Sequence, residues 1–134
     1  MIDRFRRRRR LCRAVRIGPL TIGGGAPVLV QSMTTATPSQ IVAGVAQCRA
    51  LREAGCPLVR FTTPTVAEAE ALAPLRQALA ADGLGDLPLV ADVHFQPAAA
   101  TAALAHADKV RVNPGNFDDR PLHPGETWDD ARWT

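Results

Sequence analysis

Residues 89–116, LVADVHFQPAAATAALAHADKVRVNPGN, predict two Val-rich strands separated by an Ala-rich helix. Both strand-like runs carry polar side chains two positions apart, Asp92 and His94 in the first and Arg111 and Asn113 in the second. Side chains two apart in a strand point to the same face. A buried strand with one polar face indicates that this face lines a site.

The same strand and helix unit recurs along the chain. Short β-branched runs alternate with helical patterns four times, which is typical of βαβ units with a parallel sheet and right-handed crossovers. We expect strands over 27–33, 57–64, 87–95 and 109–116, and helices over 41–55, 66–83 and 97–108.

Local signals mark the helix ends. Ser39 is the expected N-cap of the first helix and Gly55 its stop. Thr65 can cap the second helix, where Pro74 should introduce a kink or divide the helix in two. Pro97 suits the first turn of the third helix.

Two α/β architectures fit this order: an open doubly wound sheet, or part of a (β/α)8 TIM barrel. A whole barrel needs about 250 residues, so this chain of 134 residues holds about four βα units, half a barrel. Ahead of the first strand, residues 15–27 (VRIGPLTIGGGAP) predict a short hairpin. The three glycines precede a strand, whereas a phosphate loop follows a strand and opens a helix, so a flexible hairpin return is favoured.

Composition indicates one soluble globular domain, with 46% hydrophobic and 22% charged residues. The net charge of +3 misleads, because eight of the sixteen basic residues lie in the first sixteen positions. The run FRRRRR could be a nucleic-acid arm, the start of a signal peptide or a solvated leader. The apolar core of a signal peptide is missing and no groove-reading motif accompanies the run, so the solvated leader is favoured.

The chain holds no run of the roughly 18 apolar residues that a membrane span requires, so we expect a cytoplasmic protein with neither a membrane nor a nucleic-acid partner. Cys12, Cys48 and Cys56 match no zinc, iron–sulfur or redox spacing. Buried structural thiols are the expectation for Cys48 and Cys56, and no metal site is expected.

Strand parity collects the polar residues on one face. If the apolar positions of the later strands, namely Val59, Phe61, Val93, Val110 and Val112, face the helices, the others face the barrel interior. Most of them sit at the carboxyl ends of the strands, where parallel folds bind ligands. The inward set is Arg60, Thr62, Asp92, His94, Lys109, Arg111 and Asn113.

This set suggests binding of a small phosphorylated ligand. Arg60 and Arg111 can present planar forks to phosphate oxygens, and His94 can donate to phosphate or transfer a proton. Asn113 and Gln31 can form hydrogen bonds with ester or hydroxyl oxygens of the ligand. Asp92 can accept from a ligand hydroxyl or orient an arginine. A purely structural ion pair of Asp92 with Arg60 or Arg111 is the alternative.

Five strings resemble one enzyme family: VRIG, IGGGAPVLVQSMT, REAGCPLVRFT, PLVADVHF and KVRVNPGNF. Together, over residues 9–119, they are similar to the N-terminal barrel of 4-hydroxy-3-methylbut-2-enyl diphosphate synthase, and VRFT and NPGNF look more like its longer, three-domain form. The resemblance implies the methylerythritol phosphate route to isoprenoids, with reductive ring opening of 2-C-methyl-D-erythritol 2,4-cyclodiphosphate. Electrons from ferredoxin or flavodoxin would pass through a 4Fe-4S cluster, and the full-length enzyme is expected to be a homodimer.

The resemblance also implies residue roles. In the family, arginines, a histidine and an asparagine at the strand ends hold the diphosphate. By motif these are Arg60, His94, Arg111 and Asn113, and Gln31 and Asp92 lie in matching strings.

The chain departs from the family in its cysteines. The family holds its cluster with three cysteines and a glutamate in a separate C-terminal domain, and the cysteines here do not match that set. We therefore expect a basic tail over 1–16, a partial barrel over 17–119, an irregular tail over 120–134 and no iron–sulfur domain, with no turnover by this chain alone. The alternative is a non-catalytic anion-binding half-barrel that self-assembles through its sheet edges, and a third hypothesis is nucleic-acid binding through the Arg-rich run.

Overall fold

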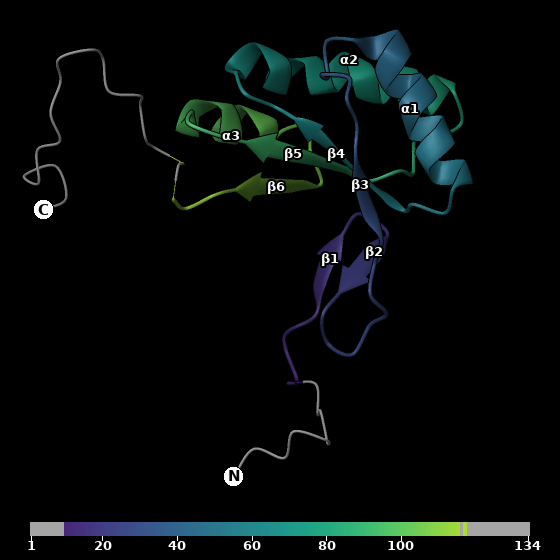
Figure 1. The fold of residues 1–134 in the computed structure, drawn as a ribbon, viewed down its shortest axis with the longest axis vertical. Coiled ribbons are helices and arrows are strands. Elements are labelled where there is room, and N and C mark those ends of the chain that lie inside the picture. The colour runs from purple at the N-terminus through teal and green to yellow at the C-terminus, as the bar shows by residue number, and fades with distance from the viewer. Residues whose placement is uncertain (1–9, 116, 118–134) are drawn as a thin grey trace, which may run out of the picture.

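The structure is a computed structural model that describes residues 10–115 and Phe117. Four parallel strands form one sheet in chain order, and the helices that connect them all lie on one face of it (Figure 1). This α/β arrangement is the predicted one. The sheet strands are β3 (Gln31–Met33), β4 (Leu58–Thr62), β5 (Leu89–Val93) and β6 (Lys109–Val112), and the helices are α1 (Ile41–Glu53), α2 (Val66–Ala81) and α3 (Pro97–Ala103).

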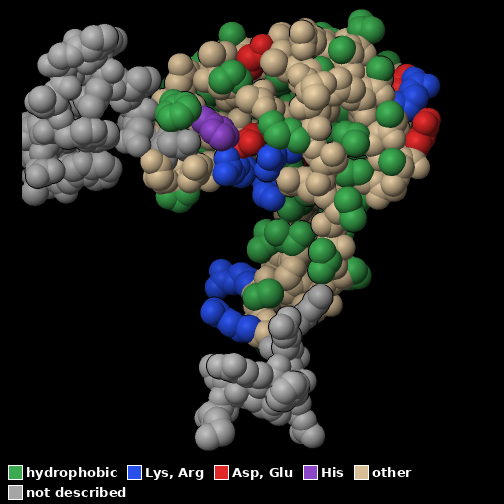
Figure 2. All heavy atoms as spheres, in the orientation of Figure 1, with side chains coloured by type: hydrophobic (Ala, Val, Ile, Leu, Met, Phe, Trp, Pro, Cys, Tyr) green, Lys and Arg blue, Asp and Glu red, His purple; other side chains and the backbone are tan. Residues whose placement is uncertain are grey.

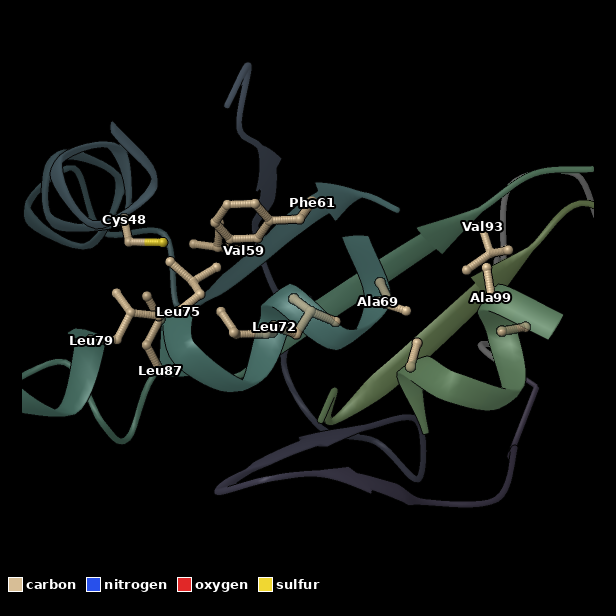
Figure 3. Packing of buried hydrophobic residues seen from close by; sticks show 14 residues of the cluster. Cys48, Val59, Phe61, Ala69, Leu72, Leu75, Leu79, Leu87, Val93 and Ala99 are labelled. Atoms are coloured by element: carbon tan, nitrogen blue, oxygen red, sulfur yellow. The ribbon is translucent and has the colours of Figure 1, made fainter. Parts of the chain in front are cut away.

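The core lies between the sheet and these helices (Figure 3). Val59 and Phe61 of β4 and Val93 of β5 point toward the helices, as parity predicts, and all three are fully buried. The apolar stripe of α2 and Cys48 of α1 meet them, because positions three and four apart share one helix face. Val112 of β6, which was also expected to pack against the helices, is instead 39% exposed. No helix of the described residues covers the end of β6.

Several elements are shorter than expected. β3 begins at Gln31, four residues later than predicted, because its ladder with β4 starts only where Gln31 lies opposite Leu58. Helix α3 ends at Ala103, five residues early, and a turn follows it. The amide of Asp108 then donates to the carbonyl of Leu89 at 3.0 Å, which directs the chain into β6.

The helix-end predictions are partly right. Thr65 caps α2 by accepting a hydrogen bond from the Glu68 amide, Pro97 begins α3, and Gly55 (φ +83°) follows the end of α1. Ser39 does not cap α1, because its hydroxyl donates to the carboxylate of Glu68 in α2. The N-cap residue is Gln40, whose side chain makes no capping hydrogen bond.

Pro74 does not divide α2, which runs unbroken from Val66 to Ala81. Proline removes one amide donor and leaves the carbonyl four residues earlier, that of Glu70, without its usual partner. Pro74 and Glu70 are both exposed, so that carbonyl is accessible to water.

The predicted hairpin consists of β1 (Val15–Ile17) and β2 (Leu20–Ile22), paired antiparallel. It lies on the side of the sheet opposite the helices (Figure 1). Ile17 packs there against Leu58 and Val90, so the hairpin covers the amino-terminal end of the inner sheet face. β1 starts inside the range 1–16 that we expected to be a tail.

The return after β2 depends on glycine. Gly23 and Gly24 have positive φ angles, and a Cβ on Gly23 would lie 2.4 Å from the carbonyl oxygen of Arg13. No helix within the described part of the chain is long and apolar enough to cross a membrane. The predictions for the Arg-rich run up to residue 9 and for the tail 120–134 lie outside the described residues.

Candidate anion-binding site at the carboxyl ends of the strands

The site is built by the pairing of three strands. In the parallel ladder Asp92 lies between Thr62 of β4 and Arg111 of β6. Arg60 lies two residues closer to the amino ends, opposite Val90. These side chains point away from the helices because alternate residues of β4 and β5 fill the helix-covered core.

Asp92 is the centre of the site. Its side chain is only 4% exposed, and three partners surround it. Oδ1 accepts a hydrogen bond from Arg111 Nη1 at 2.9 Å and lies 3.0 Å from His94 Nε2, and Oδ2 lies 3.4 Å from Arg60 Nε. A buried carboxylate needs such charged partners to remain ionised.

His94 can adopt two hydrogen-bond arrangements. Its Nε2 lies 2.9 Å from Arg111 Nη1 as well as 3.0 Å from Asp92 Oδ1. In the tautomer without a hydrogen on Nε2, this nitrogen accepts from the Arg111 guanidinium. In the tautomer with a hydrogen on Nε2, it donates to the Asp92 carboxylate, and one nitrogen cannot do both. The next residue, Phe95, has φ 59° and turns the chain immediately after His94, with its ring 6.1 Å from the imidazole.

The site has an excess of positive charge. The inward-facing cations are Arg60, Arg111 and, by strand parity, Lys109, whereas Asp92 is the one inward carboxylate of the described strands. Figure 2 shows Lys and Arg side chains gathered beside an acidic and a histidine side chain, on the side of the body that faces the hairpin. Their excess charge favours an anion.

The two arginines keep hydrogen-bond donors free for such an anion. Among the described residues, Arg111 bonds to protein only through Nη1, and its side chain is 37% exposed. Arg60 contacts the sulfur of Met33 through Nη2, and its Nε is buried with no hydrogen bond of acceptable geometry to any described residue. A phosphate oxygen can accept from the remaining guanidinium N–H groups.

Two of the predicted residues lie apart from this cluster. Asn113 uses its side-chain oxygen to accept from the Gly115 amide at 3.3 Å, which stabilises the turn over Pro114. Gln31 is exposed at the amino-terminal end of the sheet, opposite Leu58 and two residues before the row of Arg60. The structure thus brings together Arg60, Asp92, His94 and Arg111.

Met33 was missed by the sequence reasoning. It lies opposite Arg60 in the β3–β4 ladder, and its sulfur receives the 3.2 Å contact from Arg60 Nη2. The signal was present, because Met33 is two residues after Gln31 and therefore shares its face.

The residues of the chain do not fit an iron–sulfur cluster. Cys12 is exposed in the hairpin segment, while Cys48 and Cys56 are buried, as predicted. Burial, assisted by the nearby Cys56, raises the pKa of the Cys48 thiol to about 12, whereas a cluster ligand must be a thiolate. No group of three or more His, Cys, Asp or Glu side chains that could hold a metal occurs within residues 10–115 and Phe117.

The chain is similar in sequence to one enzyme family. The family model of the GcpE TIM-barrel domain matches residues 12–127. A 4-hydroxy-3-methylbut-2-en-1-yl diphosphate synthase (flavodoxin) of Chlorobaculum tepidum is 46% identical over 110 residues, 82% of this chain and 15% of the relative. A 4-hydroxy-3-methylbut-2-en-1-yl diphosphate synthase (ferredoxin) of Gloeobacter violaceus is 47% identical over 119 residues, 88% of this chain and 30% of the relative. The chain therefore spans less than a third of these relatives.

Proposed function

Because the chain belongs to the GcpE TIM-barrel domain family, we propose that it forms the substrate-binding, amino-terminal part of a 4-hydroxy-3-methylbut-2-en-1-yl diphosphate synthase. Its four parallel strands and three helices are part of a TIM barrel. The proposed ligand is the diphosphate of 2-C-methyl-D-erythritol 2,4-cyclodiphosphate, the substrate that the family resemblance implies. The relatives are named for flavodoxin or ferredoxin, and one of these would donate electrons to the complete, dimeric enzyme.

The observation that supports the proposal is the pair of arginines held by one buried carboxylate. Asp92 takes one N–H of Arg111 and lies beside Nε of Arg60, so both guanidiniums are directed to the carboxyl ends of the strands. Their remaining N–H groups can bind phosphate oxygens bidentately. The ligand's negative charge would compensate the excess positive charge that Asp92 leaves.

His94 would add a donor whose state depends on the ligand. Without an anion, Nε2 can accept from Arg111 at 2.9 Å. A bound phosphate oxygen would draw that guanidinium N–H away, and the imidazole tautomer with its hydrogen on Nε2 could then donate to Asp92 or to the phosphate. The role proposed for this chain is to bind and orient the diphosphate; the redox chemistry would belong to cluster ligands that its described residues do not supply.

Isothermal titration calorimetry of the full chain with inorganic diphosphate, and separately with the cyclodiphosphate, tests the proposal. We expect Arg111→Ala to weaken binding at least about tenfold, the scale of a lost charge-assisted contact. Arg49→Ala is the matched control, because Arg49 of α1 pairs with Asp82 on the helix side of the sheet. Equal affinity of wild type and Arg111→Ala would contradict the site, and absence of wild-type binding would contradict the function.

A further inference from the structure

The loop between β3 and α1, residues 34–40, lies at the carboxyl end of β3, next to the site. Its first residue, Thr34, extends the β3–β4 ladder: the Thr34 amide donates to the carbonyl oxygen of Arg60 at 2.9 Å. The Thr34 hydroxyl is also 3.4 Å from that oxygen and donates to the carbonyl of Ala36 at 2.9 Å. The loop is therefore attached to the backbone of an arginine of the proposed site.

Gln47 of α1 fixes the next two residues of the loop. Its Oε1 accepts from the amides of Thr35, at 2.9 Å, and of Ala36, at 3.3 Å. Its Nε2 donates to the Thr35 hydroxyl at 2.9 Å. One side chain therefore makes three hydrogen bonds to two successive loop residues.

Glu68 of α2 fixes the other end of the loop. Its two carboxylate oxygens accept from the Ser39 amide at 3.0 Å and from the Ser39 hydroxyl at 2.7 Å. Between the two ends, the Thr37 amide donates to the side chain of Gln40 at 3.1 Å, and the Gln40 amide donates to the Thr37 carbonyl at 3.0 Å.

Every amide of the loop consequently has a protein acceptor, since Pro38 carries no N–H. Thr34, Ala36 and Pro38 are buried, whereas the other loop residues are partly or fully exposed, so the pairing includes amides that could otherwise bind water. It has two consequences. The loop is held in one conformation against Arg60, and it offers no free backbone N–H to a phosphate.

On the basis of the proposed function, we propose that Gln47 is a positioning residue for diphosphate binding. It acts through the β3–α1 loop on Arg60 and on Met33, whose sulfur contacts the Arg60 guanidinium. Phosphate oxygens are then bound by side chains of the strands and not by amides of this loop. Glu68 supports the same conformation from the neighbouring βα unit.

The test is diphosphate affinity of Gln47 variants of the full chain, with inorganic diphosphate as the probe. Gln47→Met keeps the shape but can neither accept nor donate, and we expect roughly a fivefold to tenfold weaker Kd, the scale of lost hydrogen bonds to a preorganised site. Gln47→Glu keeps the one acceptor oxygen, Oε1, that the Thr35 and Ala36 amides share, and its second oxygen can accept from the Thr35 hydroxyl, so its Kd should be restored to within about twofold. Gln77→Met is the matched control, because Gln77 is an exposed residue of α2.

A residue that serves stability alone would give a different pattern. Gln47→Met would then lower the unfolding midpoint and leave the Kd of the folded protein unchanged, which would overturn the positioning role. If Gln47→Met does not fold, Glu68→Met removes both acceptors of Ser39 and releases the loop from its other end, and the same loss or retention of affinity decides. A wild-type chain that binds no diphosphate would overturn the proposed function, and the positioning role with it.

Discussion

Asp92 stabilises the site by being almost completely buried among positive partners. Removing the charge leaves Arg111 and Arg60 facing each other without the carboxylate that lies between them. Breaking a buried ion pair costs about 3–5 kcal/mol, and less where the partners are partly exposed, as these arginines are. The carboxylate therefore contributes to stability as well as to the orientation of the two guanidiniums.

We expect Asp92→Asn to lower the free energy of unfolding by about 2–3 kcal/mol in urea denaturation, because Asn keeps the size of Asp but places an uncharged amide beside two guanidiniums. Asp86→Asn is the control: Asp86 is a surface carboxylate paired with Arg52 at 2.8 Å, and exposed pairs contribute little. Equal effects of the two substitutions would show that Asp92 is not the centre of the ion-pair cluster.

At the residue scale, parity predicted the direction of the side chains, and the ion pairs of Asp92 with Arg60 and Arg111 that were considered as a structural alternative are both present. The period of two placed Arg60, Asp92 and Arg111 on one face, and the ladder does bring them together. Parity could not predict how far Gln31 lies from the carboxyl ends of the strands. That distance depends on the register of β3 against β4, which local sequence does not specify. Gln47 gave no signal at all, since a glutamine on an amphipathic helix is ordinarily solvated.

At the element scale, the identity of each helix and strand was predictable and its length was not. Alternation of β-branched runs with helical stripes identifies every element of the sheet and of its helix layer. The ends depend on tertiary pairing, as when the Asp108 amide bonds to Leu89 rather than continuing α3. Ser39 shows the same competition: its hydroxyl can cap α1 or bind Glu68, and the carboxylate is the stronger acceptor.

The uninterrupted α2 leads to a prediction about Pro74. A proline inside a helix costs up to about 3 kcal/mol through a missing hydrogen bond and steric crowding. Pro74→Ala restores the amide donor to the Glu70 carbonyl and should raise the free energy of unfolding by about 1–3 kcal/mol in urea denaturation. Pro97→Ala is the control, because the first helical turn needs no donor there. Unchanged stability of Pro74→Ala would mean that water already compensates the free carbonyl.

On the scale of the whole molecule, the two faces of the sheet differ in what covers them. Helices bury the outer face completely near Phe61, whereas, among residues 10–115 and Phe117, the inner face is covered only at its amino-terminal end, by the β1–β2 hairpin. Parallel sheets are ordinarily buried on both faces. Within the described residues, β3 and β6 each pair on one side alone, and this fits a chain that spans less than a third of its relatives.

The hairpin was predictable as an element, but its position was not, because nothing local in VRIGPLTI indicates which surface it contacts. Ile17 is 3% exposed and packs against Leu58 and Val90, which belong to two different strands of the sheet. The hairpin is thereby part of the folded unit and closes the end of the inner face opposite to the anion site. Weakening its contact with the sheet should consequently lower the stability of the whole sheet.

We expect Ile17→Ala to lower the free energy of unfolding by about 2–3 kcal/mol, the lower range for truncating a buried aliphatic side chain, because this cluster is small. Val15→Ala in the same strand is the matched control, since Val15 is 48% exposed and truncation there should cost well under about 1 kcal/mol. Circular dichroism at increasing urea measures both variants. A docked hairpin requires one cooperative transition that moves to lower urea in Ile17→Ala, whereas an unchanged helical transition would mean that β1 and β2 fold apart from the sheet.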